Sequence, residues 1–161
     1  MNASGGVPQF WNLLQGVGTC MLVTFDGGVL RARPMRPLAD AARGEVQFLT
    51  SRKSHKIQEI SQDCAVNLSF VDARAGQYVS ISGSANSTQD RAAIRRVWDG
   101  DADLWFADGP DSDDVMLIRV VPSRAEVWER ETNTLKAYWE KNKALGSTEQ
   151  PNLGTDRKLD L

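Results

Sequence analysis

The chain has 161 residues, of which 41% are hydrophobic and 25% are charged, and its formal net charge at pH 7 is -2. A chain of this length is expected to form one domain whose hydrophobic core is large enough to need no disulfide or metal. One histidine and two cysteines exclude a Cys/His zinc site, and no apolar run approaches the roughly 20 residues that cross a membrane.

The N-terminal residues and the cysteines predict a cytoplasmic protein. Residues 1–7 read as a flexible leader, and the first 15 residues contain neither lysine nor arginine nor a compact apolar stretch. No secretory signal is therefore expected. Cys20 and Cys64 each lie within an apolar run, which predicts two buried free thiols and leaves a disulfide or redox pair as the alternative.

Hydrophobic periodicity and turn residues predict short strands with a few short helices. The predicted strands are 19–25, 29–36, 45–50, 65–71, 77–85, 115–121 and 125–129. The predicted helices are 54–62, 88–98, 135–145 and a first one that begins at Pro8 and ends at Gly16. Residues 37–44 read as a loop. This pattern favours a small β-barrel over a doubly wound sheet, and the sequence has no GxGxxG motif for a dinucleotide fold.

Four residues refine these boundaries. Pro34 lacks the amide that a central strand needs, so its strand is expected to end there or to lie at a sheet edge. Gly83 indicates a β-bulge, and Pro122 is expected to break the strand that begins at residue 115. Thr88 is predicted to be the N-cap of the helix that follows it.

Positive charge is concentrated in one stretch of an otherwise acidic chain. Residues 31–56 contain seven basic and two acidic side chains, a net charge of +5, whereas the remainder has 12 basic and 19 acidic residues and carries -7. Clustered cations focus an electric field and indicate a local anion site, although a surface with ion pairs made elsewhere in the fold is the alternative. Phe48 is the only aromatic residue of this stretch, so it lacks a stacking platform and no nucleic-acid partner is predicted.

The segment from Thr50 to Lys56 combines hydroxyl groups with cations where a strand gives way to a helix. Hydroxyls stand at positions 50, 51 and 54, and cations at positions 52, 53 and 56. A helix start offers unpaired backbone amides and a partial positive charge, so the pattern is typical of a phosphate site. The alternative is that Ser54 only caps the helix, while His55 and Lys56 are solvated.

Six segments resemble one known family in the same order along the chain. They are Arg33-Pro34-Met35, Phe48-Leu49-Thr50, Ser54-His55-Lys56, YVSISGSA at 78–85, WFADGP at 105–110 and AEVW at 125–128. Together with the PNLG tail at 151–154, they are similar to the general stress protein 26 branch of the pyridoxamine 5'-phosphate oxidase-like, FMN-binding split barrels. The resemblance covers nearly the whole chain from Phe10 onward.

The resemblance implies a mainly β fold, a six-stranded split β-barrel over residues 8–145, with an extended C-terminal tail at 146–161. It implies a homodimer that holds one FMN in each of two grooves between the subunits, and FAD stays open as the flavin. Nine residues are implied to bind the cofactor: Arg33, Pro34, Met35, Thr50, Ser51, Ser54, Lys56, Tyr78 and Trp128.

The same resemblance implies a role for each part of this set. The strand at 33–35 would run beside the flavin ring, and the 50–56 segment would hold the phosphate, with Arg52 or Lys53 as alternative ligands. Tyr78 and Ser80 lie on a strand that faces the cofactor in relatives, and Trp128 would reach the ring edge from the partner subunit. The alternative for Met35, Tyr78 and Trp128 is ordinary packing.

The sequence departs from true pyridoxamine phosphate oxidases after residue 129. Those enzymes carry an Arg-x-His element that grips the substrate, whereas residues 131–136 read ETNTLK, so oxidation of vitamin B6 is disfavoured. Two functions stay open: a flavin-dependent oxidoreductase that acts on an unidentified small molecule, and a non-catalytic flavin-binding stress or redox-sensor protein. A third alternative replaces FMN by haem or a deazaflavin. No metal site is predicted, because the aspartates at 111, 113 and 114 read as an acidic turn.

Overall fold

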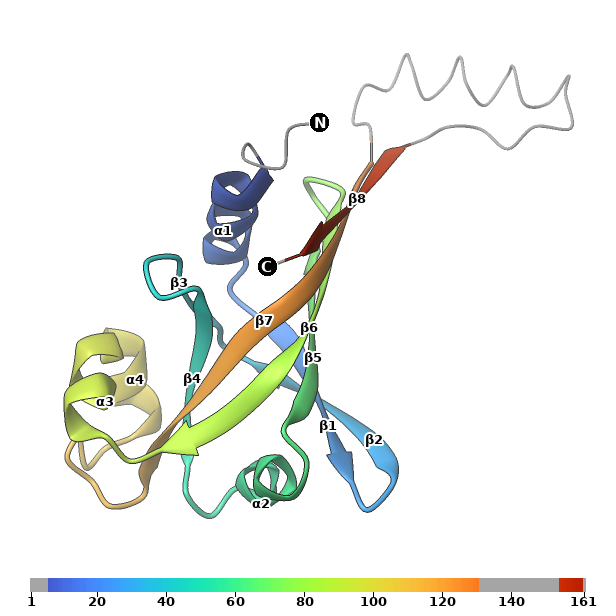
Figure 1. Ribbon diagram of the computed structural model, residues 1–161. Coiled ribbons are helices and arrows are strands. Elements are labelled where there is room, and N and C mark those ends of the chain that lie inside the picture. The colour runs from blue at the N-terminus through green and yellow to red at the C-terminus, as the bar shows by residue number, and fades with distance from the viewer. Residues whose placement is uncertain (1–5, 131–153, 161) are drawn as a thin grey trace, which may run out of the picture.

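The computed structural model describes residues 6–130 and 154–160, which form eight strands and four helices (Figure 1). Along the chain these are α1 (Gly6–Gly16), β1 (Cys20–Asp26), β2 (Val29–Met35), β3 (Leu38–Asp40), β4 (Glu45–Ser51), α2 (His55–Gln62), β5 (Ala65–Asp72), β6 (Gln77–Thr88), α3 (Arg91–Val97), α4 (Gly100–Trp105), β7 (Val115–Arg130) and β8 (Gly154–Asp160). The prediction of a mainly β protein with a few short helices is confirmed.

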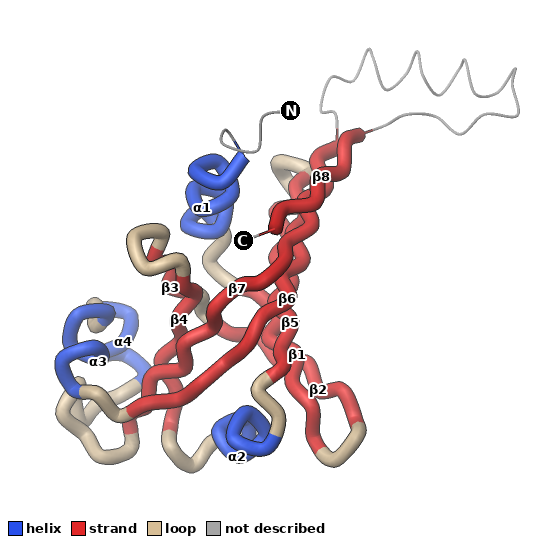
Figure 2. Tube along the Cα trace, viewed as in Figure 1, coloured by secondary structure: helices blue, strands red, loops and turns tan. Residues whose placement is uncertain are grey.

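All eight strands belong to one antiparallel sheet (Figure 2). The strand order is β2-β1-β5-β6-β7-β4-β3, with β8 added beside β7. β7 is long enough to pair with β6 along one edge, and with β4 and then β8 along the other. Because the order begins with β2 and ends with β3, the sheet does not close on itself. Pro34 accordingly lies on an edge strand, as predicted.

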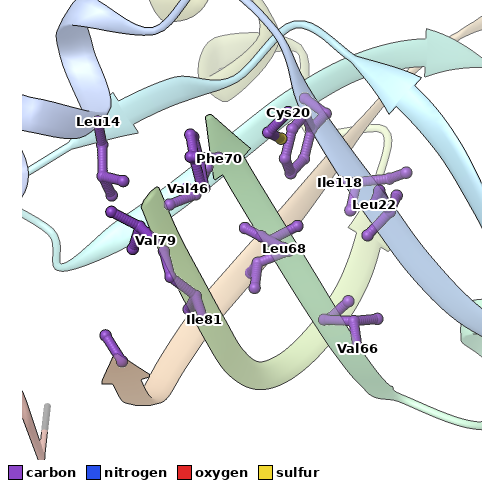
Figure 3. Packing of buried hydrophobic residues seen from close by; sticks show 14 of the residues in the cluster. Leu14, Cys20, Leu22, Val46, Val66, Leu68, Phe70, Val79, Ile81 and Ile118 are labelled. Atoms are coloured by element: carbon purple, nitrogen blue, oxygen red, sulfur yellow. The ribbon is translucent and has the colours of Figure 1, made fainter. Parts of the chain in front are cut away.

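The sheet encloses one main hydrophobic core (Figure 3). Leu22 of β1, Leu68 of β5 and Ile81 of β6 are cross-strand neighbours and are completely buried. Phe10 and Leu14 of α1 belong to the same cluster, so this helix packs on the main core. Each large apolar side chain removed from water in this way stabilises the fold by about 1.5–3 kcal/mol.

A second, smaller core cluster packs α3, and Phe106 directly after α4, against the sheet. Ala93 and Ile94 of α3 are buried with Val115 and Leu117 at the start of β7. The partly buried residues around them are Leu49, Val97, Trp98 and Phe106. The two helices therefore lie against the part of the sheet formed by β4 and the start of β7 (Figure 1).

β7 runs through Pro122 without a break, so the prediction of two separate strands is wrong. The pairing register between β6 and β7 shifts between Ser82 and Gly83, which confirms the predicted bulge. Gly83 stands opposite Pro122, and a Cβ atom at position 83 would lie only 2.4 Å from the Val121 carbonyl oxygen. Proline is tolerated at such an irregularity, because the amide that it lacks is not needed for a regular ladder there.

Two other local predictions are corrected. The predicted loop at 37–44 contains β3, which pairs with β4. Thr88 is the last residue of β6 and not a helix cap. Asp90 caps α3, because its side chain accepts hydrogen bonds from the amides of Ala92 and Ala93.

The C-terminal part of the described chain adds one strand. Residues 154–160 form β8 along the second half of β7, whereas the predicted helix at 135–145 lies outside the described residues. α4 occupies a stretch for which the sequence predicted no helix. Among the helices of the described chain, none has both the length and the apolar character needed to span a membrane.

The two cysteines are free and have different environments. Cys20 is buried in β1, as predicted, and burial raises the pKa of its thiol to about 12. Cys64 is exposed in the short connection between α2 and β5, so its predicted burial is wrong. The buried positions of β5 begin only at Val66.

Candidate functional site

The ends of β2 and β4, the start of α2 and the helix α4 surround an open pocket of about 480 Å³. The pocket is lined by Thr19, Pro34, Met35, Arg36, Leu38, Leu49, Thr50, Ser51, Lys56, Ala102, Trp105 and Phe106. Five of the nine predicted site residues are therefore brought together here: Pro34, Met35, Thr50, Ser51 and Lys56. The lining is polar on the side of α2 and apolar on the side of α4.

The α2 side of the pocket is built around Lys56. Its ammonium group donates hydrogen bonds to the hydroxyls of Thr50, at 3.0 Å, and Ser54. Burial lowers the pKa of Lys56, the charge of Arg33 lowers it further, and Glu59 opposes the shift. A half-buried ammonium whose bonds go to hydroxyls, and not to a carboxylate, is available to an anion in the pocket.

Ser54 stands at the N-cap position of α2, but its hydroxyl makes no capping hydrogen bond. It accepts a hydrogen bond from Lys56 instead, so the interpretation in which Ser54 only caps the helix is wrong. As far as the structure describes the chain, no side chain caps the first turn of α2, and that turn contains no acidic residue. The positive end of the helix dipole is thus free to meet a bound anion.

The α4 side of the pocket is apolar. Met35 and Leu38 come from β2 and β3, Leu49 comes from β4, and Trp105 and Phe106 come from the end of α4. Trp105 is 81% exposed. A flat apolar group bound in the pocket would cover part of this surface.

Arg36 ties the end of β2 to α4. Its guanidinium lies 2.5 Å from Asp99 Oδ2 and 3.3 Å from Asp101 Oδ2. Asp99 also caps α4 by accepting a hydrogen bond from the Ala102 amide, and its hydrogen bond with Arg36 lowers its pKa. These two carboxylates neutralise the charge of the Arg36 guanidinium. Arg36 therefore holds α4 in place beside the pocket and is less available to an anion than Lys56.

The basic stretch at 31–56 is largely paired within the fold. The ion pairs are Arg31 with Asp26, Arg33 with Glu59, Arg36 with Asp99 and Arg43 with Asp40. Within residues 6–130 and 154–160, the structure gives no ion pair to Arg52, Lys53 or Lys56. The ion-paired alternative is therefore correct for most of the stretch, and the candidate anion site narrows to the 52–56 segment.

Arg33 lies beside the pocket and not in its lining. Its guanidinium donates to the hydroxyl of Thr24 and, at 2.7 Å, to Glu59 Oε2. This pairing directs the Arg33 charge toward α2, close enough to affect the pKa of Lys56. Direct contact between Arg33 and a cofactor stays a prediction.

Tyr78 and Trp128 lie outside the pocket lining. They face each other across β6 and β7 and are 36% and 38% exposed. Val71 pairs with Tyr78, and Met21 lies further along the same face of the sheet, where it pairs with Pro34. We call these four residues the outer strip: Met21, Val71, Tyr78 and Trp128. A role for Tyr78 and Trp128 in the site stays a prediction.

The sequence prediction of the site missed the α4 side. Trp105 and Phe106 belong to one of the segments that carry the family resemblance, but no site role was assigned to them. An adjacent tryptophan and phenylalanine just ahead of an Asp-Gly-Pro turn is the signal that could have located this side, because residues next to loops often serve binding. Arg36 and Leu38 gave no such signal, because their role depends on the distant α4.

Comparison with known proteins identifies a family and one curated relative. The family model described as pyridoxamine 5'-phosphate oxidase like matches residues 6–152. Protein bli-3 of Neurospora crassa is 31% identical over 111 residues, which are 62% of this chain and 53% of that protein. The chain thus spans about half the length of this curated relative.

Solved structures share the fold. The general stress FMN/FAD binding protein from Xanthomonas citri is 29% identical, with a TM-score of 0.68 over 78% of this chain and 89% of that one. A candidate general stress family protein from Xanthomonas campestris pv. campestris is 25% identical, with a TM-score of 0.73 over 83% and 92% of the two chains. A candidate general stress protein 26 from Jannaschia sp. CCS1 has a TM-score of 0.75 at 24% identity and covers 98% and 99%. The predicted split-barrel fold is confirmed, and its sheet does not close into a complete barrel.

Proposed function

Since the chain belongs to the pyridoxamine 5'-phosphate oxidase-like family, we propose that it binds FMN in the pocket between α2 and α4. Thr50, Ser51 and Lys56 hold the phosphate, and Pro34 and Met35 lie beside the flavin ring. The general stress FMN/FAD binding protein from Xanthomonas citri supports a flavin ligand, and FAD is the alternative flavin.

One observation carries this proposal. The Lys56 ammonium donates hydrogen bonds to two hydroxyls at the start of α2, and the Ser54 side chain at the N-cap position makes no capping hydrogen bond. A phosphate group there meets a cation, hydroxyl donors and the positive end of a helix dipole. The apolar residues across the pocket suit a planar aromatic ring. The pocket volume of about 480 Å³ lies within the range of about 300–1,000 Å³ that small-molecule sites occupy.

The flavin, when bound, supplies the redox chemistry, and the protein supplies binding and orientation. Lys56 and the start of α2 fix the phosphate end. Met35, Leu49 and Phe106 exclude water from the apolar side of the pocket. Arg36 keeps that side in place through its ion pairs with α4.

The proposal includes a homodimer. The outer strip is exposed and apolar, and it approaches the pocket because Met21 pairs with Pro34. Packing of two copies on this strip would remove its side chains from water. It would also bring Tyr78 and Trp128 of one subunit toward the flavin of the other. We also propose a cytoplasmic location for the protein.

The function is tested by titrating the purified protein with FMN, riboflavin and FAD while flavin fluorescence is recorded. We expect saturable binding of one FMN per chain and clearly weaker binding of riboflavin, which lacks the phosphate. Mass analysis of any chromophore that is purified with the protein checks the identity of the ligand. Equal affinities for riboflavin and FMN would contradict the phosphate assignment, and the absence of binding would refute the function.

A second candidate function is flavin binding without turnover. The described lining of the pocket contains no aspartate, glutamate, histidine or cysteine, and its one lysine, Lys56, is assigned to the phosphate. Anaerobic addition of NADH or NADPH to the FMN-loaded protein separates the two functions. Bleaching of the bound flavin supports an oxidoreductase. Failure of both reductants with FMN still bound supports a stress or sensor protein.

A further inference from the structure

Three side chains that are able to bind a metal meet beside the pocket, where the end of β1 approaches α2. Asp26 ends β1, and His55 and Glu59 lie one turn apart on α2. His55 Nε2 is 3.4 Å from Asp26 Oδ2 and 3.9 Å from Glu59 Oε1, and the three ligand atoms lie within 4.8 Å of one another. We propose that Asp26, His55 and Glu59 form a binding site for a divalent transition metal ion of the zinc type.

Glu59 distinguishes this cluster from an ordinary group of surface charges. Its side chain is only 2% exposed. Oε2 accepts hydrogen bonds from Arg33 and Thr24, whereas Oε1 is buried and has no hydrogen-bond partner. A buried carboxylate oxygen without a donor is costly. Oε1 is directed at the His55 imidazole, and a metal ion bound between them would satisfy it.

The partners of Glu59 resemble the outer shell of a metal site. Carboxylates that bind a metal are commonly held by hydrogen bonds on their other oxygen, which orients the ligand atom. Arg33 and Thr24 do this here because both bind Oε2 and leave Oε1 available.

The spacing of the three ligand atoms is close to what zinc requires. Ligand atoms about 2.0–2.2 Å from a zinc ion lie about 3.3–3.6 Å from one another in a tetrahedron. Two of the three separations, 3.4 and 3.9 Å, are already near this value. The side chains of His55 and Asp26 are 60% and 31% exposed and therefore have room to adjust. Water would occupy the fourth position.

The ligand atoms favour a transition metal over magnesium or calcium. One imidazole nitrogen with two carboxylates suits zinc, whereas the harder cations prefer oxygen ligands alone. Arg31 competes for Asp26 Oδ2 at 3.2 Å, but its side chain is 55% exposed, and exposed ion pairs are weak. The metal ion can therefore displace Arg31.

The test is a calorimetric titration of the untagged, chelator-treated full chain with Zn²⁺, combined with NMR of its single histidine. We expect one zinc ion per chain and a shift of the imidazole resonances. Asp26→Asn and His55→Gln are expected to weaken zinc binding at least about tenfold. Asp111→Asn is the matched control, because Asp111 also pairs with one exposed arginine, Arg95, and this variant should bind zinc like the wild type.

Three outcomes would overturn the site. The first is no zinc binding, and the second is binding that leaves the imidazole resonances unshifted or survives both Asp26→Asn and His55→Gln. Arg31→Gln removes the competing cation and should bind zinc at least as tightly as the wild type, so weaker binding is the third. Glu59→Gln is expected to lose zinc as well, and circular dichroism checks its folding. If it does not fold, the Asp26 and His55 variants decide the test.

Discussion

Among the single residues of the pocket, Lys56 differs from its neighbours Arg52 and Lys53 in being held in place. Its ammonium is bound to the hydroxyls of Thr50 and Ser54, whereas the side chains of Arg52 and Lys53 are exposed. A side chain that is already ordered loses less conformational entropy when it binds a ligand. Lys56 is therefore the cation on which phosphate affinity should depend most.

Replacement of Lys56 tests this directly. Lys56→Ala is expected to weaken FMN binding by about 1–3 kcal/mol, the range for the loss of a charged hydrogen bond. The affinity is measured by fluorescence titration. Lys53→Ala removes the same charge from the exposed turn and is the control, with an expected loss below about 1 kcal/mol. An equal loss in both variants would contradict the special role of Lys56 in phosphate binding.

The predicted site residues that the structure brings together on the α2 side of the pocket are those whose signal is local. Thr50, Ser51 and Lys56 lie within seven consecutive positions at a strand-to-helix junction, and the chemistry of that junction can be read without the fold. The ion pairs of Arg33 with Glu59 and of Arg36 with Asp99 join segments that are distant in sequence. Nothing in the sequence near either arginine indicates its partner.

Secondary structure elements were predicted well where an apolar run or an alternating pattern is long enough. β1, β4 and β5 each have seven or eight residues and match the predicted strands closely. β3 has three residues and α4 has six, too few for a periodic signal. The continuity of β7 through Pro122 depends on Gly83 in the opposite strand, so the sequence around the proline could not reveal it.

The bulge between β6 and β7 makes a prediction about stability. Gly83→Ala would push a methyl group against the Val121 carbonyl, 2.4 Å away. It is therefore expected to lower the free energy of unfolding by about 1–3 kcal/mol. The control is Gly100→Ala at the start of α4, where a Cβ meets nothing within 4 Å. This variant should be neutral or slightly stabilising. Urea unfolding measures the stability of both variants. A Gly83→Ala protein as stable as the wild type would contradict the close approach of position 83 to the Val121 carbonyl.

The ion pair between Glu45 of β4 and Arg119 of β7 makes the junction of these strands sensitive to acid. Arg119 Nη2 lies 2.5 Å from Glu45 Oε1, and this hydrogen bond is the main reason why the pKa of Glu45 is lowered. The unfolded chain therefore binds a proton at Glu45 at higher pH than the folded chain does. The pair stabilises the fold fully above the ordinary glutamate pKa, and this contribution is lost as the pH falls through the lowered value.

Glu45→Gln measures this contribution. The variant is expected to be less stable than the wild type at pH 7, and the difference should shrink as the pH falls from about 5 to about 3, because only the wild type loses the pair. Urea midpoints of both proteins at several pH values give the difference, and other carboxylates cancel in the comparison. A difference that does not change with pH would show that the pair contributes nothing.

At the scale of the whole molecule, one chain supplies only part of the predicted site, since Tyr78 and Trp128 lie outside the pocket lining. If two copies pack on the outer strip, monomers should release the flavin. Val71→Lys places a charge on a strip residue that is 55% exposed, and we expect it to weaken both the dimer and FMN binding. Light scattering after size-exclusion chromatography gives the mass, and fluorescence gives the bound flavin.

Val29→Lys is the matched control for this experiment. Val29 is 62% exposed but lies in the β1–β2 hairpin, outside the strip, so this variant should stay dimeric and retain FMN. A verified Val71→Lys monomer that binds FMN like the wild type would contradict a site shared between subunits.

The long strand β7 has a consequence for how the protein is made. It pairs with β4 and β6, which precede it in the chain, so a ribosome must release residue 130 before these two strands have their full partner. Until then the nascent β4 and β6 expose unpaired edges that neighbouring chains on a polysome can capture. Chaperone protection during translation would therefore matter more for this protein than for one whose strands pair in the order of their synthesis.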